Sequence, residues 1–253
     1  MDKQYTLIFD CFSGWVDDLP PVSIVQRKRQ RTMRIRIKDK AIVVSGPASL
    51  SQKRLLQFLE EKREWIENSI RRKRDRAEKL KRKQKQTQGT ILLRGERKPL
   101  YDFPVPGLRK PGLVEHDHAV VFRFNPLSQD DNHSPAPGPD LVATFCRALA
   151  RREIHDRFNY WSDQIPFRPS RLTVRNQRTK WGSCSTRGTI SLNWRLIKCP
   201  AAIMDYIIIH ELCHLQHFNH SRAFWETVKN YYPDVREAKK WIRENSDEIF
   251  ADF

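Results

Sequence analysis

Two histidines and a glutamate in the C-terminal part of this 253-residue sequence have the spacing of a metal site. They form the pattern His210-Glu211-Leu-Cys-His214. Pro200 suits the first turn of a helix, and residues 201–218 contain neither Pro nor Gly, so we predict a helix here. At 3.6 residues per turn, the two imidazoles lie one turn apart on one face and can bind one metal ion. Glu211 is rotated by about 100° and can reach a metal-bound water without binding the metal itself.

A third ligand has to follow, because catalytic zinc usually takes three protein ligands and keeps a fourth position for water. His217 would lie about 10.5 Å further along a straight helix than His210, too far to share an ion with Zn–N bonds of about 2 Å. His220 can reach the ion if the helix ends first. Asn219 can adopt the left-handed conformation that closes a helix. We therefore favour His220 as the third zinc ligand.

Other residues near this pattern leave alternatives open. A carboxylate of Glu226 or Glu237 could replace His220 as the third ligand. Tyr206, one turn earlier on the same helix face, and His217 are candidates for positions behind the ligands. The pattern could also arise by chance on an ordinary helix. The apolar neighbours predict a buried helix, however, and an unliganded buried cluster of this kind would be costly. We therefore expect one catalytic Zn²⁺ ion.

The chemistry of such a site is hydrolysis of peptide bonds. Zinc would lower the pKa of its bound water and polarise the scissile carbonyl, while Glu211 would take the water proton and pass it to the leaving amine. Residues Thr189–Trp194 alternate strictly and predict a strand, to whose edge an extended peptide could add through backbone hydrogen bonds. Asn193 is a candidate to orient substrate. Trp194 is a candidate to line the cleft, although it could equally pack in the core.

The composition indicates acidic partners and a reducing compartment. The net charge is +17, and Lys and Arg are concentrated in Arg27–Lys40 and Lys62–Lys85. These segments predict weak, non-specific nucleic-acid binding that falls steeply with salt, without base stacking because few aromatics interleave. The five cysteines are scattered and form no C-x-x-C pair, which favours a cytoplasmic protein. The sequence offers no signal peptide and no run long enough for a transmembrane helix, so we expect no membrane partner.

The whole sequence predicts an α+β protein. Residues 1–125 form an expected N-terminal strand-rich basic subdomain with a long basic helix at about 49–85. Residues 126–140 are rich in Pro, Ser, Asp and Asn and predict a flexible connector. Residues 141–253 then form the zinc-binding domain. Within these parts we expect a hairpin of 33–38 with 42–44, strands near 91–93, 98–103 and 119–124, a helix at 141–164, and helices beginning at Ser221 and Asp234.

Several motifs occur in order and resemble the YgjP-like zinc metallopeptidase family, which is similar to SprT-like proteases. The motifs are Lys180-Trp-Gly-Ser-Cys-Ser185, Ile190-Ser-Leu-Asn-Trp-Arg-Leu196, Asp205-Tyr206, His210-Glu-Leu-Cys-His-Leu215, Asn219-His-Ser221 and Phe224-Trp225. A basic strand followed by a helix with Trp65-Ile66 also looks like that family. The resemblance implies a minimal zincin-type fold, zinc ligands His210, His214 and His220, and Glu211 as the catalytic glutamate.

Three functions follow as hypotheses from these observations. The first is a zinc-dependent metallopeptidase that acts on peptides or proteins. The second is a nucleic-acid-associated, SprT-like protease recruited by its basic segments. The third is a non-catalytic binding module stabilised by zinc, in which four protein ligands would close the coordination sphere.

Overall fold

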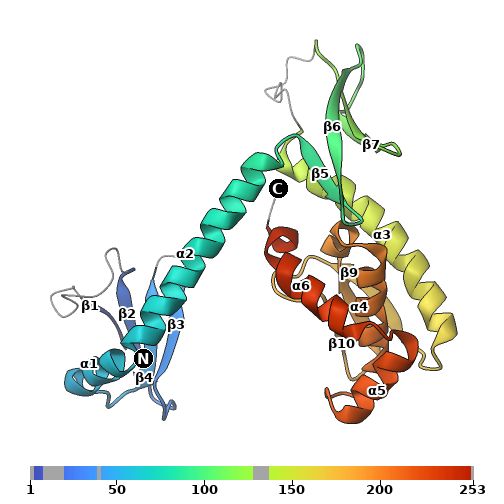
Figure 1. Cartoon of the computed structure of the whole chain (residues 1–253). Helices are drawn as coiled ribbons and strands as arrows, with labels where there is room; N and C mark the ends of the chain where they lie inside the picture. Colours follow the sequence, from blue (N-terminus) through green and yellow to red (C-terminus); the bar gives the residue numbers. More distant parts are fainter. Residues whose placement is uncertain (1–2, 8–19, 39–40, 128–136, 252–253) are drawn as a thin grey trace. The chain divides into compact units, whose positions relative to one another are not determined.

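The computed structural model describes residues 3–7, 20–38, 41–127 and 137–251, and it divides into two compact units (Figure 1). The first unit comprises Met1–Gln84 and the second Lys85–Phe253. Both units combine helices and strands, which confirms the α+β class predicted from the sequence.

A four-stranded sheet and two helices form the first unit. Its elements are β1 (Lys3–Leu7), β2 (Val22–Arg27), β3 (Arg34–Ile37), β4 (Ile42–Pro47), α1 (Gln52–Glu61) and the greater part of α2 (Arg63–Gln86). The strand order is β1-β2-β4-β3, and β3 pairs antiparallel with β4, which confirms the predicted hairpin. The core of this unit consists of Val22, Ile24, Ile42 and Val44 from the sheet and Leu55, Leu59, Ile66 and Ile70 from the helices.

The long helix predicted at about 49–85 is divided in two. The hydroxyl of Ser51 caps the start of α1. Lys62 ends α1 with φ −108° and ψ 6°, and α2 begins at the next residue. Most residues of α2 after Ile70 are exposed, because the apolar stripe that buries the first part of the helix stops there.

Two sheets and four helices form the second unit. The first sheet has the order β5-β6-β8-β7, from β5 (Thr90–Leu93), β6 (Glu96–Pro104), β7 (Gly112–Glu115) and β8 (Val120–Phe124). The second sheet consists of β9 (Arg171–Arg175), β10 (Gly182–Cys184) and β11 (Thr189–Asn193). The helices are α3 (Pro139–Gln164), α4 (Ala201–Cys213), α5 (Arg222–Tyr231) and α6 (Val235–Phe250), and the short 3-10 helix η1 (Trp194–Lys198) precedes α4.

Helix α4 lies at the centre of the second unit. It contacts α3, α5, α6, β10 and β11, and in Figure 1 it lies among the helices of this unit. An apolar residue occupies nearly every face of α4, which is the pattern of a helix that is buried all round. Within the described part of the chain, no helix combines the length and the apolar character that a membrane span requires.

The division between the units differs from the boundary predicted at residues 126–140. Ile91, Leu93 and Val120 are buried in the same core as α4, so the strands before the connector belong with the helices after it. An alternating pattern reveals that a strand has a buried face, but it does not reveal which partner covers that face. Residues 128–136 lie outside the described residues, and the flexibility of the connector stays a prediction.

The strand predicted as the edge for substrate, β11, is the central strand of its sheet. It pairs antiparallel with β10 on one side and parallel with β9 on the other. Its backbone groups are therefore used on both sides, and the prediction of a substrate edge at Thr189–Trp194 is wrong. The alternation indicates a strand without indicating its place in the sheet. The edge strand next to it is β10.

The turn between β5 and β6 docks against the segment that leads into α4. Arg94 and Gly95 donate their backbone N–H groups to the carbonyl oxygens of Ile197 and Lys198, at 2.7 and 2.9 Å. Gly95 has φ +84°, and a Cβ atom at this position would lie 2.6 Å from Cγ of Pro200. A side chain at Gly95 would therefore be strained and would also collide with the start of α4.

We expect Gly95→Ala to lower the free energy of unfolding by about 2–4 kcal/mol, because left-handed strain and overpacking add. Gly107→Ala is the matched control: Gly107 has φ +77°, but nothing lies within 4 Å of the added Cβ. The control should therefore lose only about 1–2 kcal/mol. Urea unfolding followed by circular dichroism measures both values. Equal losses for the two variants would contradict the docking of this turn.

Candidate metal centre

The central helix α4 carries the first part of the site. His210 and His214 are partly buried, and Glu211 is only 6% exposed. The helix ends at Cys213, but His214 keeps the right-handed helical conformation with φ −66° and ψ −16°. The spacing of one helical turn therefore holds, and the two imidazole rings lie 4.9 Å apart between centroids.

The chain turns earlier than predicted and brings His220 back to the helix. The helix does not continue to residue 218, and Asn219 does not adopt the left-handed conformation. The turn is instead closed by a hydrogen bond of 2.9 Å, in which Nδ1 of His214 donates to the carbonyl oxygen of His217. The side-chain oxygen of Asn219 accepts a hydrogen bond from the backbone N–H of Ser221 at 3.2 Å, which stabilises the start of α5.

The three predicted histidine ligands converge. One ring nitrogen from each of His210, His214 and His220 lies within 4.8 Å of the others. The Nε2 atoms of His210 and His220 are 3.2 Å apart. A tetrahedral ion with bonds of about 2.0–2.1 Å separates its ligand nitrogens by roughly 3.3 Å. The donor set therefore fits one metal ion.

The surroundings favour the neutral form of His210 and His220, the form that metal binding requires. The pKa of His210 is lowered to about 3, first by burial and then by charge repulsion from His214, His220 and Lys239. Burial, with His214 and Lys239, also lowers the pKa of His220. The hydrogen bond to the carbonyl oxygen of His217 places the proton of His214 on Nδ1, which leaves Nε2 free to bind a metal.

Two aromatic residues of α5 enclose the imidazoles. Phe224 is fully buried, and its ring stacks on His214 at 4.5 Å and meets His220 edge-on at 4.9 Å between centroids. Trp225 stacks on His220 at 5.5 Å with an interplanar angle of 17°. These rings restrict the orientation of the imidazoles. Sequence reasoning did not assign either ring to the site, and the available signal was their place four and five residues after His220.

Strand β10 holds Glu211 from one side. A Cβ atom at Gly182 would lie 2.7 Å from Oε1 and from Cγ of Glu211. Only glycine therefore leaves room for the carboxylate against this strand. Burial raises the pKa of Glu211 to about 7, and the nearby charge of Lys180 partly opposes that rise. A carboxyl group with such a pKa can exchange protons near neutral pH.

The two predicted substrate-binding residues are buried. Asn193 is fully buried, and its amide donates to the carbonyl oxygens of Gln177 and Lys180, both at 2.8 Å. Trp194 is 3% exposed, and its indole N–H donates to the side chain of Asn176. Both positions contradict a direct contact with substrate. Asn193 instead anchors the loop that precedes β10, because its short amide can satisfy two main-chain carbonyls at once.

The remaining candidates lie around the histidine cluster. Tyr206 is buried with its ring 6.0 Å from that of His210, beside the histidine cluster. His217 contributes its carbonyl oxygen to His214, while its own ring faces Thr227 at 3.2 Å. The alternative ligands Glu226 and Glu237 do not join the histidine cluster that the described residues form. Glu226 is paired with Arg222 at 2.7 Å.

Solved structures and a family profile match parts of the chain. No curated protein matches the chain. The chain is similar to the metallopeptidase zymogen abylysin of Pyrococcus abyssi, at 27% identity over 34% of this chain and 86% of that chain, with a TM-score of 0.31. It is also similar to the metallopeptidase zymogen jannalysin of Methanocaldococcus jannaschii, at 24% identity over 36% of this chain and 95% of that chain, with a TM-score of 0.33. The profile of the YgjP-like metallopeptidase domain matches residues 31–245, so the chain belongs to the YgjP-like metallopeptidase family.

Proposed function

We propose that this metallopeptidase is zinc-dependent, with His210, His214 and His220 as the zinc ligands and Glu211 as the general base. The observation that carries the proposal is the convergence of three imidazole nitrogens within 4.8 Å beside a buried glutamate. Membership of the family supports a metal ion and a peptide or protein substrate.

The donor set supports zinc and a catalytic rather than a structural ion. Three imidazoles are a common zinc set, and structural zinc sites usually have four protein ligands. The residues that the structure describes offer three ligands in this cluster, which leaves one coordination position for water or substrate. This argues against a non-catalytic zinc-stabilised module. A zinc ion bound here would act as a Lewis acid on the scissile carbonyl and would lower the pKa of water.

Glu211 is suited to move the proton during hydrolysis. Its carboxylate would accept a proton from the attacking water and deliver it to the nitrogen of the leaving amine. The close approach of Gly182 restricts where this carboxylate can lie. A buried, positioned base needs little reorganisation when the reaction begins, because its surroundings are already arranged.

The edge of β10 is our candidate for the substrate-binding strand, in place of β11. β10 pairs with β11 on one side only, and it carries Gly182 next to Glu211. An extended peptide that added to this edge would run past the general base. The second hypothesis, recruitment by nucleic acid through Arg27–Lys40 and Lys62–Lys85, has no support in the family assignment and stays a prediction.

The ligand assignment can be tested by metal affinity. Loss of a residue that only supports a metal ligand lowers metal affinity by roughly 10–100-fold. We expect His220→Ala to lower zinc affinity by more than this, because it removes a direct ligand. His217→Ala should lower it by less than about tenfold, since the carbonyl oxygen that orients His214 remains. Zinc titration of metal-free protein against a competing chelator measures both. Loss of zinc by His217→Ala with retention by His220→Ala would mean that the third ligand is misassigned.

A substitution at Glu211 can separate the effect on hydrolysis from the effect on metal binding. We expect Glu211→Gln to keep one zinc ion per chain, while the rate of peptide hydrolysis falls by about 10²–10⁴-fold because an amide cannot accept the proton. Metal content and hydrolysis of a general protein substrate are measured on the same preparation. An undiminished rate in this variant would rule out Glu211 as the base.

A side chain at position 182 should slow hydrolysis by displacing the carboxylate of Glu211. We expect Gly182→Ala to reduce the rate by about 10–100-fold with zinc retained, because the added methyl group displaces the carboxylate. Gly112→Ala is the matched control, since nothing lies within 4 Å of a Cβ atom at Gly112. In the Glu211→Gln background, Gly182→Ala should add little further loss, because both changes act through one side chain. Fully additive losses would contradict this coupling.

A further inference from the structure

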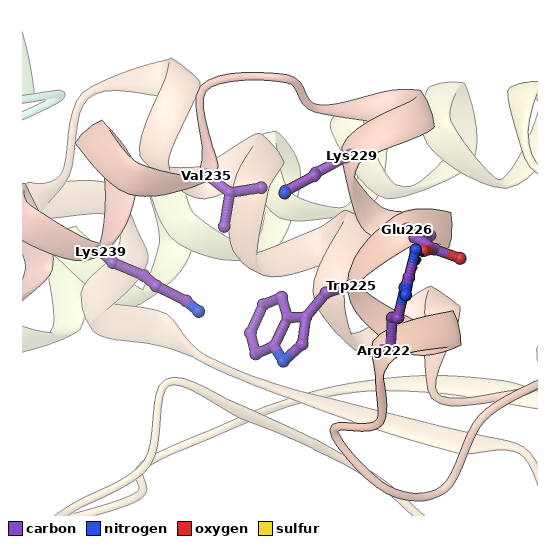
Figure 2. A pocket seen from close by; sticks show the side chains of 6 residues that line it. All are labelled: Arg222, Trp225, Glu226, Lys229, Val235 and Lys239. Atoms are coloured by element: carbon purple, nitrogen blue, oxygen red, sulfur yellow. Dashed lines mark hydrogen bonds and ion pairs between the residues drawn. The ribbon is translucent and has the colours of Figure 1, made fainter.

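A cavity of about 500 Å³ lies beside the histidine cluster, between α5 and α6. Its walls are formed by Arg222, Trp225, Glu226, Lys229, Val235 and Lys239. Figure 2 shows Lys239 extending from α6 toward the ring of Trp225, and Lys229 extending from α5 toward Val235. Trp225 and Val235 supply apolar lining, and the amino groups of two lysines extend toward it from two helices.

The residues that line this cavity carry more positive than negative charges. Glu226 is its only acidic lining residue, and it already pairs with Arg222 at 2.7 Å. Within the described residues, neither Lys229 nor Lys239 has a carboxylate partner. The amino group of Lys239 lies 3.3 Å from the centroid of the Trp225 ring. Burial and the charge of Lys229 both lower the pKa of Lys239, which indicates that the two ammonium groups repel each other.

Trp225 joins the cavity to the metal centre. Its ring forms a wall of the cavity and stacks on His220 at 5.5 Å. The amino group of Lys239 and the imidazole of His220 contact the same ring, so they lie within roughly three residues of extended chain, at about 3.3–3.6 Å per residue. The separation alone therefore permits a side chain close to the scissile bond to reach the cavity.

We propose that this cavity is a specificity subsite that binds a carboxylate of the peptide substrate, within three residues of the scissile bond. This inference rests on the proposed peptidase function. Two ammonium groups without acidic partners attract an anion and disfavour a cation, and the indole ring packs against the aliphatic part of an acidic side chain. The carboxylate could belong to a Glu side chain or to the C-terminus of the peptide.

The test uses the full-length, zinc-loaded protein and synthetic alanine-based peptides. In each peptide one position carries Glu, Gln or Lys, and each sequence is made with a free or an amidated C-terminus. The first readout is the ratio of kcat/KM for the Glu peptide to that for the Gln peptide. The second is the ratio of their dissociation constants for the Glu211→Gln protein, measured by calorimetry, which needs no hydrolysis.

We expect a preference of about 3- to 10-fold for Glu at one position near the scissile bond, since each partly exposed ion pair contributes modestly. Lys239→Gln and Lys229→Gln should each reduce this ratio, and Lys239→Glu should reverse it in favour of a Lys peptide. Lys240→Gln is the matched control, because Lys240 is exposed on the same helix but does not line the cavity. A preference that depends only on the free C-terminus would assign the cavity to the chain end.

The outcomes distinguish the subsite from the peptidase function. Hydrolysis without any preference for a carboxylate, or a preference unchanged in the Lys229→Gln/Lys239→Gln double variant, overturns the subsite and leaves the peptidase proposal intact. Tighter binding of carboxylate peptides, lost in the double variant and accompanied by no hydrolysis of any peptide, supports the subsite and overturns the peptidase proposal. Equal binding of Glu and Gln peptides without hydrolysis overturns both.

Discussion

The burial of α4 is the constraint on which the site depends. Its isoleucines are removed from water, and the helix carries His210 and Glu211 with them into the core. Burial disfavours the charged form of each group, so it lowers the pKa of His210 and raises that of Glu211. One physical cause thus yields a neutral imidazole and a carboxyl group that exchanges protons near neutral pH.

The part of the site that sequence analysis predicted well is local in the chain. The separation of His210 and His214 follows from helix geometry alone, so tertiary structure was not needed to place them on one face. The return of His220 depends on the turn after Cys213, which a hydrogen bond from His214 to a backbone carbonyl closes. That bond cannot be read from residue types, and the predicted route through a left-handed Asn219 was therefore incorrect although His220 joins the cluster.

The predictions that failed concern which partner an element meets. Alternation correctly identified β11 as a strand, but a central strand and an edge strand have the same alternation. The pattern at Ile91 and Leu93 indicated a buried face without indicating that α4 and its neighbours cover it. The role of Gly182 depends in the same way on a contact with Glu211, 29 positions away in the sequence. Such contacts are set by packing between segments that are distant in the sequence, so they cannot be inferred from composition.

Residues at the start of α5 contact both the histidine cluster and the cavity. Phe224 and Trp225 hold the imidazoles, and Trp225 is also a wall of the basic cavity. A change at Trp225 would therefore alter the packing of His220 together with the shape of the cavity. Lys229 and Lys239 line the same cavity without entering the histidine cluster. Lys239 also contacts the Trp225 ring, so a change at Lys239 would alter the charge of the cavity and the packing behind His220 together.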